Sequence, residues 1–160
     1  MSSNFTIALI KSPSVGRGHA LPIISRITQS GFVVSALQIK TLCPTTIRAF
    51  YCEHVGKEYY GSLMKSVSED VVALVLTRHD DKDVVAEWRA LMGATNAATA
   101  AAGTIRHFFG GFNWRGKESP ISDNAVHGSD SDKAALYEYS VLFDGYMWPK
   151  DPSEFTSHKE

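Results

Sequence analysis

The sequence predicts an α/β fold, in which helices pack on a four-stranded, mainly antiparallel sheet to form a sandwich. Short apolar runs rich in β-branched residues alternate along the chain with segments whose apolar residues recur at helical spacing. The 160 residues also suit one domain with a hydrophobic core. We expect that domain to span residues 1–148, with a polar C-terminal extension at residues 149–160.

The first half of the chain opens with an apolar run and then a cluster of Ser, Pro and Gly. The run is typical of a strand, and the cluster favours a loop. Leu21, Ile24 and Ile27 follow at helical spacing, and Gly31 suits the end of that helix. The expected elements are a strand over 5–10, a loop over 12–16, a helix over 20–29, a strand over 32–37 and a helix over 44–54 that has a Pro near its start.

The second half continues this alternation. A dense apolar run predicts a buried strand, and the helix after it has an acidic first turn. Small residues without a hydrophobic period indicate an ordered loop before the last strand, with room for one short helical turn. The expected elements are a strand over 71–76, a helix over 83–92, the loop over 94–103, a strand over 124–127, and a helix over 131–143 with Ser131 or Asp132 near its cap and Ala134, Leu136, Tyr139 and Phe143 on its buried face.

The composition argues against several classes of protein. The chain has 16 basic and 17 acidic residues, so no global field attracts nucleic acid or an anionic membrane, and it has no basic stripe. Its two cysteines, Cys43 and Cys52, make no disulfide framework, which favours a reducing compartment. No apolar run is long enough to span a bilayer. We expect a soluble, cytoplasmic protein, with an organelle left open, and neither a membrane nor a specific nucleic acid as partner.

The segment NAVHGSDS at residues 124–131 contains a candidate nucleophile, His127. An imidazole beside a glycine that allows close backbone approach, with hydroxyls and a carboxylate near it, is equipped for covalent group transfer. Histidine in a Gly/Ser/Asp turn is also typical of a solvated surface loop. The segment by itself leaves both interpretations open.

Groups suited to phosphate occur elsewhere in the chain. Phosphoryl transfer needs cations and neutral donors at one point, because the transferring group spreads negative charge over its oxygens. Lys11 ends the first strand, Arg89 lies on a helix, and Thr95 and Arg106 flank the alanine-rich loop. A lone cation is more often a solvated surface charge, and an aromatic residue more often belongs to the core or its rim. The candidates gain weight only as a set.

The order of five segments is similar to the nucleoside diphosphate kinase family. That family has a strand ending in Lys, then Phe-Tyr-x-Glu-His, Arg-x-Leu-Met-Gly-x-Thr-Asn, Gly-Thr-Ile-Arg and Asn-x-x-His-Gly-Ser-Asp-Ser. The resemblance spans roughly residues 5–143 and implies a ferredoxin-like α/β sandwich. The matching segments are ALIK at 8–11, FYCEH at 50–54, RALMGATN at 89–96, GTIR at 103–106 and NAVHGSDS at 124–131.

The resemblance implies that His127 is the phosphorylated nucleophile. A nucleoside triphosphate would give its γ-phosphoryl group to the imidazole, and a nucleoside diphosphate would then take it in a ping-pong cycle. Glu138, eleven residues further along, matches the glutamate that orients the imidazole, and Ser129 would add a hydroxyl group. Both kinds of nucleotide are therefore the expected partners.

The resemblance also implies a nucleotide site with Mg²⁺. Tyr59 matches the aromatic residue that stacks on the base, which predicts weak base discrimination. Mg²⁺ would be held mostly by the nucleotide, with Asp130 acting through water. His54, in the Phe-Tyr-x-Glu-His segment, is expected to have a structural role in its helix. The residues implied for phosphate and ribose are Lys11, Tyr51, Arg89, Thr95, Arg106 and Asn124.

Three departures identify a divergent member of the family. Ser12-Pro13-Ser14 replaces the usual Pro-Asp after Lys11, and Ala97 and Ala98 follow Thr95-Asn96 where the family has a proline in a loop of its subunit contacts. Residues 110–123 form a longer connection before the catalytic strand. The family's subunit contacts imply a homo-oligomer. The changed loops motivate an alternative, a nucleotide-binding or partner-binding module of the same fold with weak or no phosphotransfer.

Overall fold

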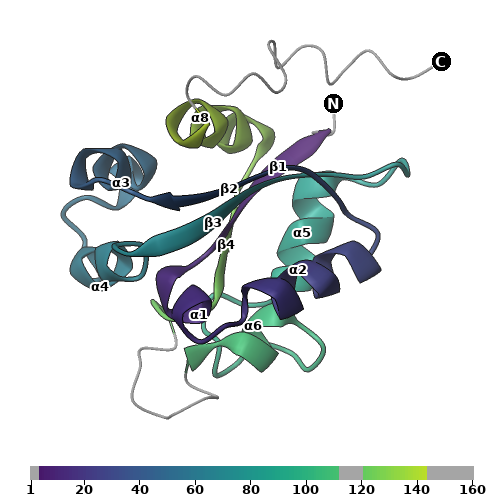
Figure 1. The fold of residues 1–160 in the computed structure, drawn as a ribbon, viewed down its shortest axis with the longest axis horizontal. Coiled ribbons are helices and arrows are strands. Elements are labelled where there is room, and N and C mark those ends of the chain that lie inside the picture. Colours follow the sequence, from purple (N-terminus) through teal and green to yellow (C-terminus); the bar gives the residue numbers. More distant parts are fainter. Residues whose placement is uncertain (1–3, 112–120, 144–160) are drawn as a thin grey trace.

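The computed structural model describes residues 4–111 and 121–143, and its centre is one four-stranded sheet (Figure 1). The strand order is β2-β3-β1-β4, and each neighbouring pair is antiparallel. Helical segments connect β1 to β2 and β3 to β4, as expected for the ferredoxin-like arrangement. The predicted class and sheet are confirmed. The strands are β1 (Phe5–Ile10), β2 (Val33–Thr41), β3 (Asp70–Thr77) and β4 (Val126–Gly128).

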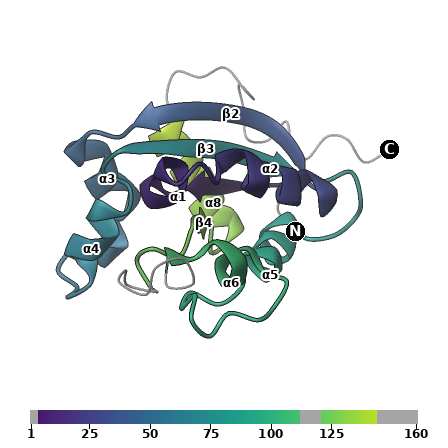
Figure 2. The same ribbon diagram turned by 60° about the horizontal axis from the view of Figure 1, so that its bottom comes forward.

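The central strand β1 divides the core into two layers, because successive side chains of a strand point to opposite faces of the sheet. All six residues of β1 are buried. Phe5, Ile7 and Leu9 pack with α3 and α8, whereas Ala8 and Ile10 pack with α2 and α5 (Figures 1 and 2). These four helices are α2 (Ala20–Gln29), α3 (Pro44–Phe50), α5 (Val84–Met92) and α8 (Asp132–Leu142).

Short helices are where the structure departs from expectation. Residues 12–16 form a helix and not a loop, because Pro13 stands in the first turn, where its fixed φ suits a helix. The helix expected over 44–54 ends at Phe50, and a 3₁₀ turn, Cys52–His54, follows it. Helices of five or six residues carry too little periodicity to be recognised. They are α1 (Ser12–Gly16), α4 (Tyr60–Lys65) and α6 (Ile105–Phe109).

Helix α8 begins as expected but turns a different face to the core. The Ser131 hydroxyl accepts a hydrogen bond from Ala134 N at 3.1 Å, so Ser131 is its cap. Leu136 is 42% exposed, and the prediction that it is buried was wrong. The buried positions of this helix include Glu138, a carboxylate that apolar periodicity does not count. The buried face of α8 therefore combines Glu138 with the apolar residues Ala135 and Leu142.

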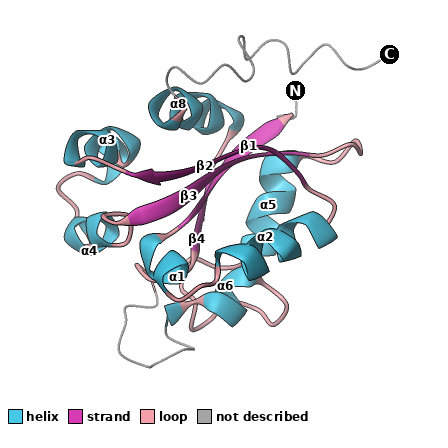
Figure 3. Cartoon of the chain, in the orientation of Figure 1, coloured by secondary structure: helices cyan, strands magenta, loops and turns pink. Residues whose placement is uncertain are grey.

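Two further expectations concern loops and the chain end. Residues between α5 and α6 form the predicted ordered loop, with a turn in which Thr99 N donates to Asn96 O at 3.1 Å (Figure 3). Strand β2 continues to Thr41, beyond the expected end at Leu37. Its last residues alternate polar and apolar side chains, as is typical of a strand at the edge of a sheet. The extension at 149–160 and most of the long connection lie outside the described residues. Within the described ranges, no helix combines the length and apolarity needed to cross a membrane.

Candidate active site

His127 is held in a strand and not in a loose surface turn. It lies in β4 opposite Leu9 of β1, and Val126 and Gly128 on either side of it are buried. A Cβ atom at Gly128 would lie 2.4 Å from Trp88 Nε1, so only glycine lets α5 pack this closely. The indole Nε1 of Trp88 donates to the backbone carbonyl of His127 at 3.3 Å. The interpretation as a solvated loop residue does not fit this backbone.

A strained turn precedes the strand. Ala125 has a φ of 73°, in the left-handed region that residues other than glycine rarely adopt. Its carbonyl accepts a hydrogen bond from Lys11 N at 2.9 Å, at the end of β1. Such a conformation costs on the order of 1 kcal/mol and persists only where its surroundings enforce it. The turn therefore fixes the point from which His127 projects.

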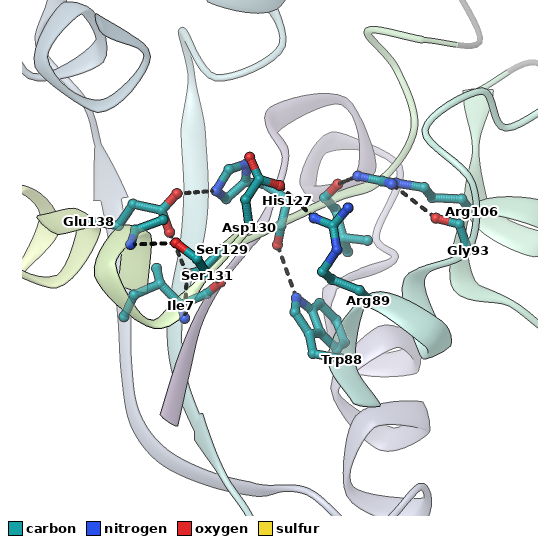
Figure 4. Close-up of polar contacts among 12 residues, drawn as sticks. Ile7, Trp88, Arg89, Gly93, Arg106, His127, Ser129, Asp130, Ser131 and Glu138 are labelled. Carbon is teal, nitrogen blue, oxygen red and sulfur yellow. Dashed lines mark hydrogen bonds and ion pairs between the residues drawn. The ribbon is translucent and has the colours of Figure 1, made fainter. Parts of the chain in front are cut away.

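A chain of hydrogen bonds holds the imidazole from one side (Figure 4). His127 Nε2 lies 2.9 Å from Glu138 Oε1, and the Ser129 hydroxyl donates to Glu138 Oε2 at 2.5 Å. Ser129 Oγ in turn accepts from Ile7 N of β1 at 3.1 Å. Ser129 and Glu138 are buried, whereas the His127 side chain is 19% exposed. One ring nitrogen is thus engaged by the carboxylate, and the ring orientation is fixed.

A cleft of about 520 Å³ opens beside His127, and its size suits a small-molecule ligand. Residues from five separate parts of the chain line it, and the structure brings together every residue that the sequence assigned to nucleotide or metal. Ser129 and Glu138 lie behind the imidazole and do not line this cleft. The assigned residues in its wall are Lys11, Tyr51, Tyr59, Arg89, Thr95, Arg106, Asn124, His127 and Asp130.

Two buried cations form the inner end of the cleft. The pKa of Lys11 is lowered to about 7, mainly by burial and also by the nearby charge of Arg106, while Asp123 acts in the opposite direction. Burial, followed by the charge of Arg89, lowers the pKa of Arg106 to about 10. Lys11 Nζ donates to Ser122 O at 3.2 Å. Because the fold disfavours both positive charges, an anion between them would be stabilised.

Three polar side-chain atoms at the same end lack hydrogen-bond partners among the described residues. Tyr51 Oη, Asn124 Oδ1 and Arg106 Nε are buried without a hydrogen-bond partner among the described residues. Burial and the charge of Glu138 raise the pKa of Tyr51, so its phenol remains a neutral donor. Asn124 Nδ2 donates to the Thr95 carbonyl at 2.8 Å, and Arg106 donates to two backbone carbonyls at 3.0 Å each. Buried polar atoms without partners are costly, so these atoms point to a polar ligand.

The outer end of the cleft is more exposed. Arg89 Nη1 pairs with Asp130 Oδ1 at 2.5 Å, and their side chains are 50% and 75% exposed. The Tyr59 hydroxyl lies 2.8 Å from His54 Nδ1, and both side chains line the cleft. His54, for which the sequence suggested only a structural role in a helix, thus lies in a 3₁₀ turn with its imidazole at the ligand cavity. Sequence reasoning missed this position because the helix it assumed ends at Phe50.

The acidic residues of the cleft bear on whether it could bind a metal ion. Within residues 4–111 and 121–143, no group of three His, Cys, Asp or Glu side chains could hold a metal ion. Asp130 is the single acidic residue among the described residues that line the cleft. One exposed carboxylate fits a divalent cation that brings most of its oxygen ligands with it, on a polyphosphate or as water.

The sequence did not single out an ion pair between partly exposed Arg17 and buried Asp123, next to the cleft wall. Arg17 Nη1 donates to Asp123 Oδ1 at 3.0 Å, and Arg17 Nη2 also contacts Asp123 Oδ2. The two residues are 106 positions apart, and neither belongs to a matched segment. No signal in a single sequence connects them.

Comparisons with known proteins agree with this geometry. A model of the nucleoside diphosphate kinase family matches residues 4–147. The nucleoside diphosphate kinase of Flavobacterium psychrophilum is 34% identical over 91% of this chain and 97% of its own. The crystal structure of the Aquifex aeolicus nucleoside diphosphate kinase superimposes with a TM-score of 0.77 at 28% identity, covering 89% of this chain and 96% of that one. The Halobacterium salinarum nucleoside diphosphate kinase in complex with CDP gives a TM-score of 0.75 at 26% identity, covering 89% and 88%.

Proposed function

The chain belongs to the nucleoside diphosphate kinase family of nucleotide-binding transferases, and we propose that it transfers the γ-phosphoryl group of a nucleoside triphosphate to a nucleoside diphosphate through a phosphohistidine at His127. The observation that carries this proposal is the pairing of His127 Nε2 with Glu138. If Nε2 bears the proton and donates it to the carboxylate, Nδ1 keeps its lone pair. That nitrogen is then the nucleophile, on a ring that lines a cationic cleft.

The cycle has two half-reactions. The lone pair of Nδ1 attacks the γ-phosphorus, the bond from that phosphorus to the β,γ-bridging oxygen breaks, and the nucleoside diphosphate leaves with both electrons. A terminal oxygen of a second nucleoside diphosphate then attacks the same phosphorus, and the P–N bond breaks to restore the neutral imidazole. Glu138 stabilises the positive charge that develops on the ring, and Ser129 holds the other carboxylate oxygen.

The inner end of the cleft supports phosphate binding. Lys11 and Arg106 supply positive charge, and the Tyr51 phenol and the Asn124 amide supply neutral hydrogen-bond groups. We assign to these four residues the phosphates and the ribose, with Arg89 and Thr95 on the outer phosphates. The buried atoms without partners support this assignment, because phosphate oxygens would accept from Tyr51 Oη and Arg106 Nε, and a ribose hydroxyl would donate to Asn124 Oδ1.

The outer end supports loose recognition of the base. The Tyr59 ring is exposed at the cleft and is tied to His54 through its hydroxyl. Stacking on an aromatic face reads no edge pattern, so we expect several bases to be accepted. Loose base recognition suits a ping-pong enzyme, because donor and acceptor nucleotides use the same site in turn.

Asp130 is the residue that would hold Mg²⁺, through a water molecule. Bound to the nucleotide, the ion would neutralise charge on the phosphate oxygens. Asp130 pairs with Arg89 in this structure, so the carboxylate would exchange one positive partner for another. This exchange couples the metal to the arginine assigned to the phosphates.

We also infer that the chain forms a homo-oligomer. Strand β2 is an edge of the sheet, and its Leu37 and Ile39 side chains are exposed, Ile39 by 70%. An edge strand with exposed apolar side chains is a surface on which a second copy can pair. Light scattering of the wild type and of Ile39→Glu tests this. We expect a multimeric wild type and a smaller assembly in the variant, and a monomeric wild type would contradict the inference.

The main proposal is tested by following the phosphoryl group. The protein is incubated with γ-labelled ATP and Mg²⁺, and an acid-labile phosphoprotein is expected, which a nucleoside diphosphate then discharges into labelled triphosphate. His127→Ala should abolish both signals, whereas His79→Ala, at an exposed histidine outside the cleft, should retain them. A folded wild type that binds nucleotide but forms no phosphoprotein would be the binding module and not the kinase.

A further inference from the structure

The ion pair between Arg17 and Asp123 adjoins the cleft wall, because Asp123 immediately precedes Asn124, which lines the cleft. Arg17 follows α1, and Asp123 lies in the segment that leads into β4. The Asp123 side chain is 5% exposed and that of Arg17 is 23% exposed. Neither residue lines the cleft, so the pair does not touch a ligand there. Any role of the pair in the reaction must act through its neighbours.

The packing around the pair is tight. Gly111 N donates to Asp123 O at 2.7 Å, and a Cβ atom at Gly111 would lie 2.0 Å from Asp123 Oδ2. The carboxylate therefore occupies the space that a side chain at Gly111 would need. A buried ion pair contributes little net stability, because removing both charges from water offsets most of their attraction. The position of the pair in the fold therefore says more about its role than its contribution to stability does.

The residues next to the pair carry two of the proposed phosphate and ribose contacts. Ser122 O accepts from Lys11 Nζ at 3.2 Å, and Asn124 Nδ2 donates to Thr95 O at 2.8 Å. Lys11 also immediately precedes α1, and Arg17 immediately follows it. The pair therefore connects the segment after Lys11 to the segment that holds Asn124.

We propose that Arg17 and Asp123 are positioning residues, which hold Lys11 and Asn124 at the inner end of the cleft and use the Asp123 carboxylate to keep Lys11 positively charged when a nucleotide binds. This inference rests on the proposed function, because it takes Lys11 as a phosphate contact. It assigns a function to a pair that neither touches substrate nor belongs to a matched motif.

The charges around Lys11 support the proposal that Asp123 keeps its ammonium group charged. Arg106 of α6 lowers the pKa of Lys11, and Asp123 raises it against the larger effect of burial. Burial and the charge of Arg17 lower the pKa of His19, after α1, and Asp123 raises it. The other titratable groups in the cleft wall are Tyr51, His54, Tyr59, Arg89, His127 and Asp130. Asp123 is thus the negative charge behind Lys11 that opposes the desolvation of its ammonium group.

Two variants of the pair should change the pH dependence in opposite directions. Asp123→Asn keeps the shape but removes the negative charge, so the pKa of Lys11 falls and affinity is lost at a lower pH. Arg17→Gln frees the carboxylate from its partner, so the pKa of Lys11 rises and affinity persists to a higher pH. We expect midpoint shifts of about one pH unit each. The measurement is the dissociation constant of Mg·ADP by calorimetry between pH 6 and 9.

The opposite signs separate positioning through charge from a general structural role. Loosening of the cleft alone would shift both midpoints in the same direction or neither, and either result would overturn the proposal. In steady-state kinetics at pH 8, Asp123→Asn should raise KM several-fold and leave kcat within about twofold. Circular dichroism confirms that each variant is folded. If Arg17→Gln does not fold, the sign and size of the Asp123→Asn shift decide the question.

Lys11→Met separates this inference from the function on which it rests. In the Lys11→Met background, Asp123→Asn should produce no midpoint shift, because the titrating group is gone. A shift of equal size in that background would contradict the inference and leave the proposed function standing. If Lys11→Met alone leaves the affinity for Mg·ADP unchanged, Lys11 is not a phosphate contact and the proposed site itself is wrong.

Discussion

The two walls that meet at His127 differ in how their polar groups are satisfied. Glu138 and Ser129, which lie behind the imidazole and which we call the carboxylate wall, are buried and hydrogen-bonded within the protein. The cationic wall, made of Lys11, Arg106, Tyr51 and Asn124, is equally buried but holds side-chain atoms without partners among the described residues. Two of its four members also have a lowered pKa.

This difference indicates a division of labour. A group whose partners are all internal is oriented before any substrate arrives, which suits the group that must align the nucleophile. A wall whose charges are disfavoured gains most from an incoming anion, which suits the recognition of phosphates. Changes to the carboxylate wall should therefore act on kcat, and changes to the cationic wall on affinity.

The largest expected effect is at the carboxylate wall. Glu138→Gln removes the negative charge beside His127 Nε2, and kcat should fall by about 100-fold while KM stays within about twofold. Initial-rate kinetics with saturating donor nucleotide measures this. Glu58→Gln, at an exposed glutamate outside the cleft, is the matched control. If the variant changed KM alone, Glu138 would act in nucleotide binding, like the residues of the cationic wall, and not in aligning the nucleophile.

The next effect concerns stability and pH at the cationic wall. The folded-state pKa of Lys11 is about 7, below its ordinary value of 10.5, so between these values the unfolded chain holds a proton that the folded protein has lost. The free energy of unfolding should therefore rise with pH, by about 1 to 2 kcal/mol between pH 7 and 8.5. Lys11→Met should lack this rise in urea titrations. A rise of equal size in the variant would show that Lys11 titrates normally.

Lys11→Met should also weaken binding while it stabilises the protein. Affinity for Mg·ADP at pH 7 should fall by about tenfold, since one charged contact to phosphate is lost. The melting temperature should rise, because a buried amine is replaced by an apolar side chain. Calorimetry and thermal melting of one preparation measure both. A lower melting temperature in the variant would contradict the inference that the buried Lys11 amine destabilises the folded protein.

The smallest effect tests the exposed Arg89–Asp130 pair. Asp130→Asn frees Arg89, so affinity for ADP without Mg²⁺ should rise by about threefold, in keeping with the small energies of exposed ion pairs. With Mg²⁺ present, the variant should bind more weakly than the wild type. Titrations with EDTA and with Mg²⁺ measure the two cases. Equal changes in both would mean that Asp130 does not link the arginine to the metal.

The same comparison explains how far the sequence could predict this molecule. The strands and long helices follow from apolar periodicity, and the resemblance assigned most of the polar groups that line the cleft, with His54 as the exception. The short helices carry too few residues for a period, and the buried face of α8 includes Glu138, which a count of apolar residues ignores. The pair of Arg17 and Asp123 depends on two segments that meet only in the fold. Matched motifs were thus more useful for finding residues that face the ligand than for finding residues that act through their neighbours.

The pairing of β4 with β1 also has a consequence for the order of folding. Ile7 N and Ser129 Oγ, which support Glu138, are 122 residues apart, and His127 faces Leu9 across the same two strands. Closing so long a loop carries a large entropic cost, so these contacts form after the local ones. During synthesis, a nascent chain that lacks residues 126–138 has neither nucleophile nor orienting carboxylate. We therefore expect autophosphorylation to appear only after this last strand has entered the sheet.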